Sequence, residues 1–175
     1  RGPAEMNGLV KIIGSLFGDD AKPVGGQRPL SVEALTVPVA RFREAAGLLK
    51  KNYALLASEW CTDETPFGRG FGIYACYRRG MEYLIVKTEV PFDEPSFPSL
   101  TREFVPAFRF ERQMMSLMGV LPEGLPDRRP WIKFEDWPEE AWPLRKSFDA
   151  SQPLPHVEGD YLWVRAEGEG VYEIP

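Results

Sequence analysis

The sequence predicts an α+β domain in two layers: a small mixed, largely antiparallel sheet with helices on one face, followed by an extended C-terminal arm. Three observations support this fold class. Three strand-like runs rich in β-branched and aromatic residues follow one another between residues 53 and 90. Segments with apolar residues at helical spacing lie before and after these runs. From residue 123 onward, the many prolines and charges suit neither a helix nor a core strand.

Three helices are expected, and each has a start or stop signal. The first lies within residues 5–18 and ends at Gly18, and the last lies within residues 105–119 and ends at Gly119. Glycine is common directly after a helix because it adopts left-handed backbone angles freely. The middle helix follows Pro38, which suits a first helical turn. The last helix carries an apolar stripe of Phe110, Met114, Leu117 and Met118.

The strand-like runs are "YALLASEW" at 53–60, "FGIYACY" at 71–77 and "MEYLIVKTEV" at 81–90. Their short connections favour an antiparallel meander. Another short strand is expected in "LSVEALTVP", residues 30–38, after the Pro/Gly-rich linker "AKPVGGQRP". Together with the helices, these strands predict helices packed on one face of the sheet.

The chain divides into four expected segments. It begins at Arg1 rather than methionine, and the strand-like run before Pro175 has no closing element, so we expect part of a longer protein. The segments are an N-terminal helix and linker (1–26), the α+β domain (27–122), an extended Trp/Pro-rich docking arm (123–155) and the start of a following domain (156–175), which the family resemblance described below implies to be a large-subunit domain. Residues 123–155 are called the arm below.

The composition indicates a folded domain whose partners are not nucleic acids. With 43% hydrophobic and 13% aromatic residues, 175 residues can bury a sizeable core. The net charge of −5 argues against phosphate binding. No apolar run approaches membrane-spanning length, no secretory signal is visible, and Cys61 and Cys76 form no C-x-x-C pair. We therefore expect a soluble domain of the reducing cytosol without direct membrane insertion.

Few residues could carry catalysis. His156, the single histidine, lies in a proline-rich stretch where a surface position is typical. Nothing near Cys61 marks a lowered thiol pKa, and Cys76 lies in an apolar run that predicts burial. The segment "GRGFG" at 68–72 lacks the Lys-Ser/Thr of a phosphate-binding loop, so we expect a turn before a strand. No metal-ligand spacing is present. We expect no catalytic residue, cofactor or metal in this chain.

Three tryptophans in the arm indicate an interface. Trp131, Trp137 and Trp142 alternate with prolines, which keep the backbone extended and lower the entropy lost on ordering it. Tryptophan and arginine contribute most to the binding energy of protein interfaces. The arm therefore either lays its aromatic side chains on a neighbouring protein or wraps its own domain and buries them there.

A series of motifs follows residue 89 in the order "FERQ", "LMG", "GLPDRR", "FEDWPEE" and "PLRKS". In this order they resemble the 30-kDa subunit family of respiratory complex I. They are more similar to the version fused to the front of the large subunit in group 4 membrane-bound nickel–iron hydrogenases, of the formate hydrogenlyase and hydrogenase-4 type. Leu125 stands where the complex I branch commonly has histidine, which points to the hydrogenase branch. The chain departs from the family pattern at Gln113, Ser116, Pro130 and Trp131.

The resemblance implies a domain that holds no cofactor of its own. The nickel–iron centre and the iron–sulfur clusters are expected in partner domains. The arm would wrap the large catalytic subunit and help to hold it against the small iron–sulfur subunit. Within this scheme Glu111 and Arg112 would brace the last helix to the arm. The residues between 124 and 129 would form a turn that clasps the helix, and residues 143–146 would anchor the arm on the partner. The implied partner-binding residues are Glu111, Arg112, Gly124, Pro126, Asp127, Arg128, Arg129, Trp131, Trp137, Trp142, Pro143, Leu144, Arg145 and Lys146.

The function that the resemblance implies is a non-catalytic docking domain of a membrane-associated oxidoreductase complex, at the cytoplasmic face of the cell membrane. Three alternatives stay open: the 30-kDa subunit of a complex I that acts as an NADH-quinone oxidoreductase, a stand-alone protein-binding module, and an enzyme that depends on His156. Deletion of residues 124–149 discriminates between the two roles of the arm. If the arm serves docking, its deletion abolishes partner binding and leaves the domain folded. If the arm belongs to the core of its own domain, its deletion unfolds the domain.

Overall fold

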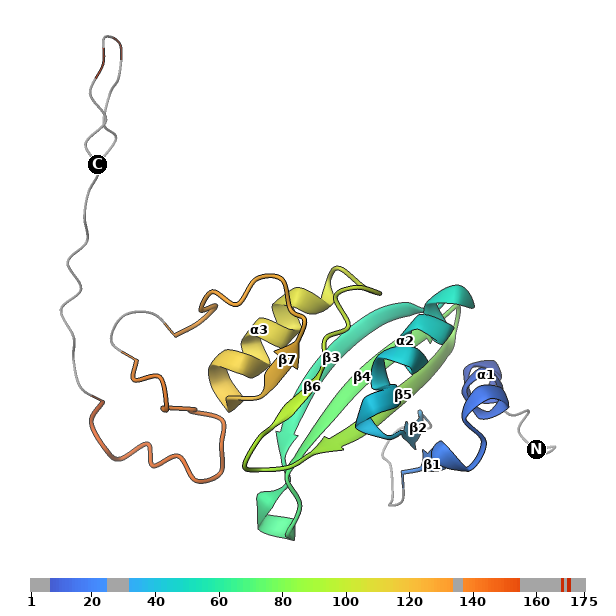
Figure 1. The fold of residues 1–175 in the computed structure, drawn as a ribbon, viewed down its shortest axis with the longest axis horizontal. Coiled ribbons are helices and arrows are strands. Elements are labelled where there is room, and N and C mark those ends of the chain that lie inside the picture. The colour runs from blue at the N-terminus through green and yellow to red at the C-terminus, as the bar shows by residue number, and fades with distance from the viewer. Residues whose placement is uncertain (1–6, 25–31, 134–136, 155–167, 169, 171–175) are drawn as a thin grey trace.

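The computed structural model describes residues 7–24, 32–133, 137–154, 168 and 170. Helices cover one face of a five-stranded sheet, and the arm runs past the far side of the last helix (Figure 1). The described helices are α1 (Gly8–Phe17), α2 (Phe42–Lys51) and α3 (Ala107–Met118), with 3-10 turns at Gly18–Asp20, Val39–Arg41 and Thr65–Phe67. The described strands are β1 (Lys22–Pro23), β2 (Glu33–Thr36), β3 (Leu55–Asp63), β4 (Phe71–Arg79), β5 (Glu82–Val90), β6 (Ser96–Pro98) and β7 (Leu121–Glu123).

The main sheet has the strand order β1-β2-β5-β4-β3. The run from β3 to β5 is the antiparallel meander that the sequence predicts. Strand β2 pairs with β5 in parallel, and β1 with β2 antiparallel, so the sheet is mixed. The predicted α+β class, with helices on one face and an extended arm, is confirmed.

One apolar core lies between the sheet and the helices. Alternate residues of β4 face it, from Phe71 to Tyr77, because side chains along a strand point to opposite faces in turn. Leu9, Ile13 and Phe17, four residues apart on α1, belong to the same core, where α1 packs on α2 and β5. The helix of segment 1–26 thus shares the core of the domain, while the exact segment boundaries stay predictions.

Several elements differ from the sequence-based expectation. Strand β3 continues beyond Trp60 to Asp63, because the residues after Trp60 remain paired with β4, as far as Asp63 opposite Phe71. The indole of Trp60 stacks on Tyr74 of β4 with ring centroids 5.2 Å apart. Two residues of the expected linker form β1, and residues 96–98, for which no strand is expected, form β6, which pairs with β7 as a second, parallel sheet. These pairings are non-local, so no periodicity in one segment reveals them.

The glycines of "GRGFG" are explained by close packing, and a turn before a strand is confirmed there. A Cβ atom at Gly70 would collide with the carbonyl oxygen of Val90 at the end of β5. At Gly72 it would lie 2.6 Å from a carboxylate oxygen of Glu64. Strand β4, not a helix, follows, so the backbone offers no helix N-terminus for a phosphate.

The helices in the described ranges are too short or too polar for a bilayer crossing. The run "DYLWVRAEGEGVYEIP", His156 and the expected start of a following domain lie outside the described residues, apart from Gly168 and Gly170.

Candidate functional site: the arm and the helix that it clasps

Arg112 of α3 joins the helix to the first part of the arm. Its side chain is buried, and its Nε and Nη2 donate to the carbonyl oxygens of Arg129 (2.9 Å) and Pro130 (2.8 Å). Its Nη1 lies 3.3 Å from Asp127 Oδ2. Asp127 also accepts hydrogen bonds from the backbone and side chain of Arg129, and these bonds, with the charge of Arg112, hold its pKa well below the usual range. The predicted bracing role of Arg112 therefore has a clear structural basis.

Trp131 lies on the outer side of α3 between two arginines. The guanidinium carbons of Arg112 and Arg109 lie 4.9 Å and 5.6 Å from its ring centroid, within range of a cation–π contact. Its backbone N–H donates to Ser116 Oγ on α3 at 3.4 Å. Although it is held in this way, 38% of Trp131 remains exposed.

Arg145 closes the other end of α3. Its Nε donates to the carbonyl oxygen of Met118 at 2.7 Å and its Nη2 to that of Gly119 at 3.4 Å. These oxygens lie at the helix C-terminus, where carbonyl groups lack helical partners and the dipole favours a cation. The guanidinium also stacks 3.8 Å above the ring of Trp142. Gly119 ends the helix with φ +64°, as expected, and leaves room for the indole of Trp142.

Two hydrogen bonds donated by backbone N–H groups of the arm add to the contacts of Arg145. Leu144 N–H donates to the carbonyl oxygen of Leu117 at 3.1 Å, and Lys146 N–H donates to Asp63 Oδ2 at 2.7 Å. Burial alone would raise the pKa of Asp63, but hydrogen bonds from Thr65 and Lys146 outweigh it and lower the pKa. The arm is therefore tied to both α3 and the end of β3.

The arm thus packs on its own domain, one of the two arrangements expected from the sequence. Trp137 and Trp142 are half-buried and line a cavity of about 630 Å³ between α3 and the arm. Trp131, Ile132 (42% exposed) and Leu144 (55% exposed) instead direct apolar surface outward. The binding of a partner by the arm remains a prediction. These outward-facing side chains are the part of the arm that could contact a partner.

The remaining predicted residues fall into two groups. Gly124 turns the chain with φ +85°. Pro126 and Arg128, which follow this turn, are exposed. Farther along the arm, Pro143 is half-buried and Lys146 is exposed. Glu111 does not reach the arm, contrary to expectation. It is fully buried, and its carboxylate accepts from Leu100 N–H (2.6 Å) and Ser99 Oγ (2.7 Å) on the opposite side of α3.

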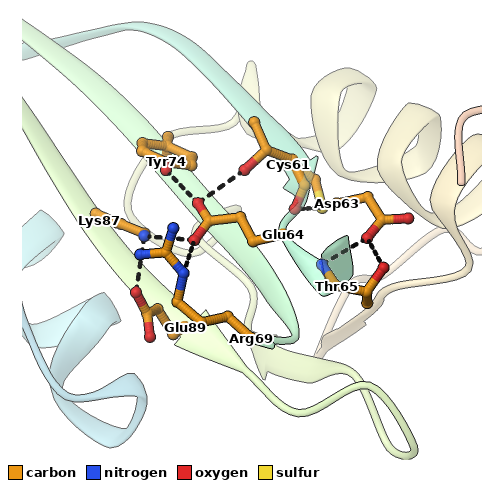
Figure 2. A network of polar contacts seen from close by, with 9 residues as sticks. Cys61, Asp63, Glu64, Thr65, Arg69, Tyr74, Lys87 and Glu89 are labelled. Atoms are coloured by element: carbon orange, nitrogen blue, oxygen red, sulfur yellow. Dashed lines mark hydrogen bonds and ion pairs between the residues drawn. The ribbon is translucent and has the colours of Figure 1, made fainter. Parts of the chain in front are cut away.

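A network around Glu64, which the sequence does not indicate, lies where β3 meets the 68–72 turn (Figure 2). Glu64 accepts from Tyr74 Oη at 2.6 Å and Lys87 Nζ at 3.0 Å, and Arg69 Nε lies 3.1 Å away. Lys87 also bonds Glu89 at 2.7 Å. Burial raises the pKa of Glu64, but the hydrogen bonds from Tyr74 and Lys87 outweigh it and lower the pKa. The two acids, Glu64 and Glu89, thus face the two bases, Lys87 and Arg69, and these contacts bind the turn to the sheet. In the sequence, the only trace of this network is a lysine, Lys87, within an apolar run.

Of the candidate catalytic residues, the structure describes the two cysteines, and burial raises the thiol pKa of both. Burial raises the pKa of the Cys61 thiol to about 12, so it is protonated at neutral pH. Cys76 is half-buried on the open face of the sheet rather than fully buried as expected, because none of the described helices covers that face (Figure 1). In the ranges that the structure describes, three or more potential ligands nowhere gather around a common point.

The chain matches the family described as respiratory-chain NADH dehydrogenase, 30 Kd subunit, over residues 35–153, which is more than half of its length. It belongs to this family, and the resemblance carried by the ordered motifs is confirmed. The matched range includes α3, the second sheet and nearly the whole arm.

Relatives come from two kinds of complex. Formate hydrogenlyase subunit 5 of Escherichia coli is 34% identical over 115 residues, which are 61% of this chain and 20% of that protein. Hydrogenase-4 component G of the same organism is 40% identical over 87 residues, 48% of this chain and 16% of that protein. NADH-quinone oxidoreductase subunit 5 of Thermus thermophilus is 35% identical over 78 residues, 44% of this chain and 37% of that protein. The chain therefore spans about a fifth of the length of the first two relatives.

Two solved structures share the fold. A trypsin-resistant fragment of Nqo5 matches with a TM-score of 0.58 and 21% identity, covering 68% of this chain and 98% of the fragment. A chain of the membrane-bound sulfane sulfur reductase, an archaeal respiratory membrane complex, matches with a TM-score of 0.66 and 20% identity, covering 81% of this chain and 84% of that chain.

Proposed function

We propose that this chain is a docking domain of a membrane-associated oxidoreductase complex of the hydrogenase or formate hydrogenlyase type. It holds the large catalytic subunit in the electron-transfer module, against the small iron–sulfur subunit. Its relatives support this role, since each is named as a subunit or component of a hydrogenase, a hydrogenlyase or an NADH-quinone oxidoreductase. The chain itself holds no cofactor in this proposal, and the nickel–iron and iron–sulfur centres belong to its partners.

The observation that carries the proposal is that some residues fix the arm on α3 while others remain exposed at its surface. Arg112, Arg145 and Gly119 use their contacts to fix the arm on α3. Trp131 and Ile132 are then held at the surface with 38% and 42% of their area exposed. A large aromatic ring fixed by its own domain loses little entropy on binding, which is the property of an interface anchor. The protein would lie at the cytoplasmic face of the membrane through its complex.

The test is to purify the tagged protein from detergent-solubilised membranes and to quantify the subunits that are recovered with it. We expect a hydrogenase-type small iron–sulfur subunit in stoichiometric amounts, and a large subunit with it where the large subunit is a separate chain. The double variant Trp131→Ala/Ile132→Ser should reduce their recovery by about tenfold or more, since truncating an interface anchor costs at least about 2 kcal/mol. Because both side chains are exposed, the fold and its circular dichroism should not change.

The matched control is Met81→Ser, which removes an exposed apolar side chain at the β4–β5 turn, away from the arm. It should leave recovery unchanged. Normal recovery of the subunits with the double variant would remove the docking role from this surface. A wild-type protein that is purified without oxidoreductase subunits would support the stand-alone binding module instead.

A second function within the same family is that of the 30-kDa subunit in an NADH-quinone oxidoreductase. The family match and the 35% identity to the Thermus thermophilus protein favour it. The same purification discriminates between a hydrogenase-type complex and a quinone-reducing complex. Recovery of a nickel-containing large subunit identifies the hydrogenase type, and recovery of a nickel-free large subunit identifies the quinone-reducing type.

A further inference from the structure

Phe67 is a large apolar side chain that a hydrogen-bonded turn holds in solvent. It ends the 3-10 turn Thr65–Phe67 between β3 and β4, and 74% of it is exposed. Its backbone N–H donates to the carbonyl oxygen of Glu64 at 3.0 Å, and the N–H of Thr65 donates to Asp63 Oδ1 at 2.9 Å. These bonds fix the turn in one conformation, so Phe67 is positioned before anything binds it.

The network of Figure 2 fixes the same turn a second time, on the sheet. Glu64, directly before the turn, accepts from Tyr74 of β4 at 2.6 Å and from Lys87 of β5 at 3.0 Å, and Arg69 Nε lies 3.1 Å away. Removing such charges from water is costly, so their use at a surface turn requires an explanation. The core does not provide one, because the turn leaves Phe67 outside it.

A second exposed aromatic ring lies beside this turn. Phe92, in the loop 91–95 after β5, is 45% exposed and stacks on Phe71 with ring centroids 5.9 Å apart. The loop touches the turn at Gly70, where an added Cβ would lie 3.0 Å from the backbone nitrogen of Phe92. The guanidinium carbon of Arg145 lies 5.4 Å from the centroid of the Phe92 ring. The two rings thus belong to one end of the sheet, beside which the arm passes (Figure 1).

The charges next to these rings are negative. Asp93 and Glu94 follow Phe92 in the same loop, and both are exposed. Within the described chain, neither acid has a cation at ion-pair distance, and Arg69 of the turn is already paired with Glu64. Aromatic rings beside free acids complement a protein surface of apolar side chains with lysine or arginine. They repel the phosphate groups of lipids and nucleic acids.

The residues of this surface, called the turn patch below, are Phe67, Phe92, Asp93 and Glu94. We propose that the turn patch binds a basic, apolar surface of a second protein of the complex, the one against which the large subunit is held. This inference rests on the proposed function. Trp131 lies on the outer side of α3, whereas the turn patch adjoins the arm at Arg145. Two separate contacts, one on each partner, would fix the orientation of the two partners relative to each other.

The first test is Phe67→Ser. The small iron–sulfur subunit recovered with the wild-type protein serves as the binding probe, and surface plasmon resonance gives the dissociation constant of each variant. We expect binding to weaken by about tenfold or more, as for the loss of an interface anchor. The melting temperature should stay that of the wild type, because the ring is exposed.

The matched control is Met81→Ser, which also removes an exposed apolar side chain from a turn. Met81 lies in the β4–β5 turn, and consecutive turns of an antiparallel meander lie at opposite ends of the sheet. Its dissociation constant should equal that of the wild type. Equal dissociation constants for Phe67→Ser and Met81→Ser would overturn the inference. A lowered melting temperature for Phe67→Ser would also overturn it, because Phe67 would then serve its own fold.

A second test, Glu94→Gln, concerns the sign of the charge on the partner. Association with the same probe should slow by about threefold or more at low salt, and the difference should shrink at high salt, where exposed charges are screened. Met81→Lys is the control, since it changes the net charge of the chain by the same amount at the other end of the sheet. It should leave the association rate unchanged. Unchanged or faster association of Glu94→Gln would overturn the inference.

The failure of this inference differs from the failure of the proposed function. If Trp131→Ala/Ile132→Ser reduces recovery of the subunits while Phe67→Ser binds the probe normally, the docking function stands and the turn patch has no part in it. If the wild-type protein recovers no oxidoreductase subunit, the proposed function is removed, and the inference with it.

Discussion

Gly119 meets two separate demands at one residue. It ends α3 in the left-handed region, with φ +64°, and its missing side chain leaves the space that the Trp142 indole fills. The first demand can be read from the sequence, since glycine after an apolar helical stripe predicts a stop. The second cannot, because Trp142 is distant along the chain and only the path of the arm brings it to the helix end.

We predict that Gly119→Ala destabilises the protein more than glycine loss at a turn alone. The left-handed conformation costs a non-glycine residue roughly 1–2 kcal/mol. The added Cβ would also collide with the Trp142 ring, which must move and leave Arg145. Urea unfolding should show a loss at least about 1 kcal/mol larger than the backbone strain. The tryptophan fluorescence of the folded variant should shift to longer wavelength as Trp142 becomes exposed.

Gly124→Ala is the control that separates the two contributions. Gly124 also has a positive φ, +85°, but no atom lies within 4 Å of the position of an added Cβ. It should show the strain alone, roughly 1–2 kcal/mol, with an unchanged emission spectrum. If both variants lose the same stability and emit alike, the Trp142–Gly119 contact contributes nothing measurable.

At the scale of elements, the second part of the arm, residues 142–146, is held on α3 mainly by Arg145. We predict that Arg145→Gln frees residues 142–146 from α3 while the sheet stays folded. The change removes the charged donor to Met118 and the stack on Trp142, and a hydrogen bond to a charged group contributes about 1.5–3 kcal/mol. Hydrogen exchange at Leu144 and Lys146 should accelerate by roughly tenfold or more. Exchange in β4 and β5 should not change.

Lys146→Ala is the corresponding control. Lys146 bonds Asp63 through its backbone N–H, which alanine retains, and its side chain is exposed. Its exchange rates should match those of the wild type. Equally fast exchange in both variants would show that a positive charge in the arm, rather than the contacts of Arg145, holds the arm in place.

The elements that the sequence predicts are those whose signal is local. Periodicity reveals α1 and α3, and short turns reveal the β3–β5 meander. The parallel pairs β2–β5 and β6–β7 depend on contacts far apart in sequence, and no local pattern predicts them. The same limit applies to the site. Motif order marks Arg112 and Arg145, but the direction in which Glu111 points and the burial of Glu59 follow from packing alone.

In the molecule as a whole, buried acids make the stability depend on pH in two opposite ways. Asp63 and Glu64 have lowered pKa values, because hydrogen bonds outweigh the effect of burial. They contribute stability above their unfolded pKa values that is lost as the pH falls. Glu59 has a pKa raised well above 4.5 by burial and by the charge of Glu111. The folded chain then binds more protons than the unfolded chain above pH 4.5, so this group lowers stability as the pH rises towards its folded pKa.

We therefore predict that the melting temperature of Glu59→Gln exceeds that of the wild type by a margin that grows from pH 5 to pH 8. Each unit by which the folded pKa of Glu59 exceeds its unfolded value adds about 1.4 kcal/mol, or roughly 3–6 °C. Asp63→Asn provides the opposite trend. Its deficit relative to the wild type should shrink as the pH falls below about 4 and protonation breaks the same contacts. Calorimetry of the three proteins across this range tests both signs. A Glu59→Gln margin that stays constant with pH would mean that the pKa of Glu59 does not change on folding, and burial on β3 would then not be the cause of the pH dependence.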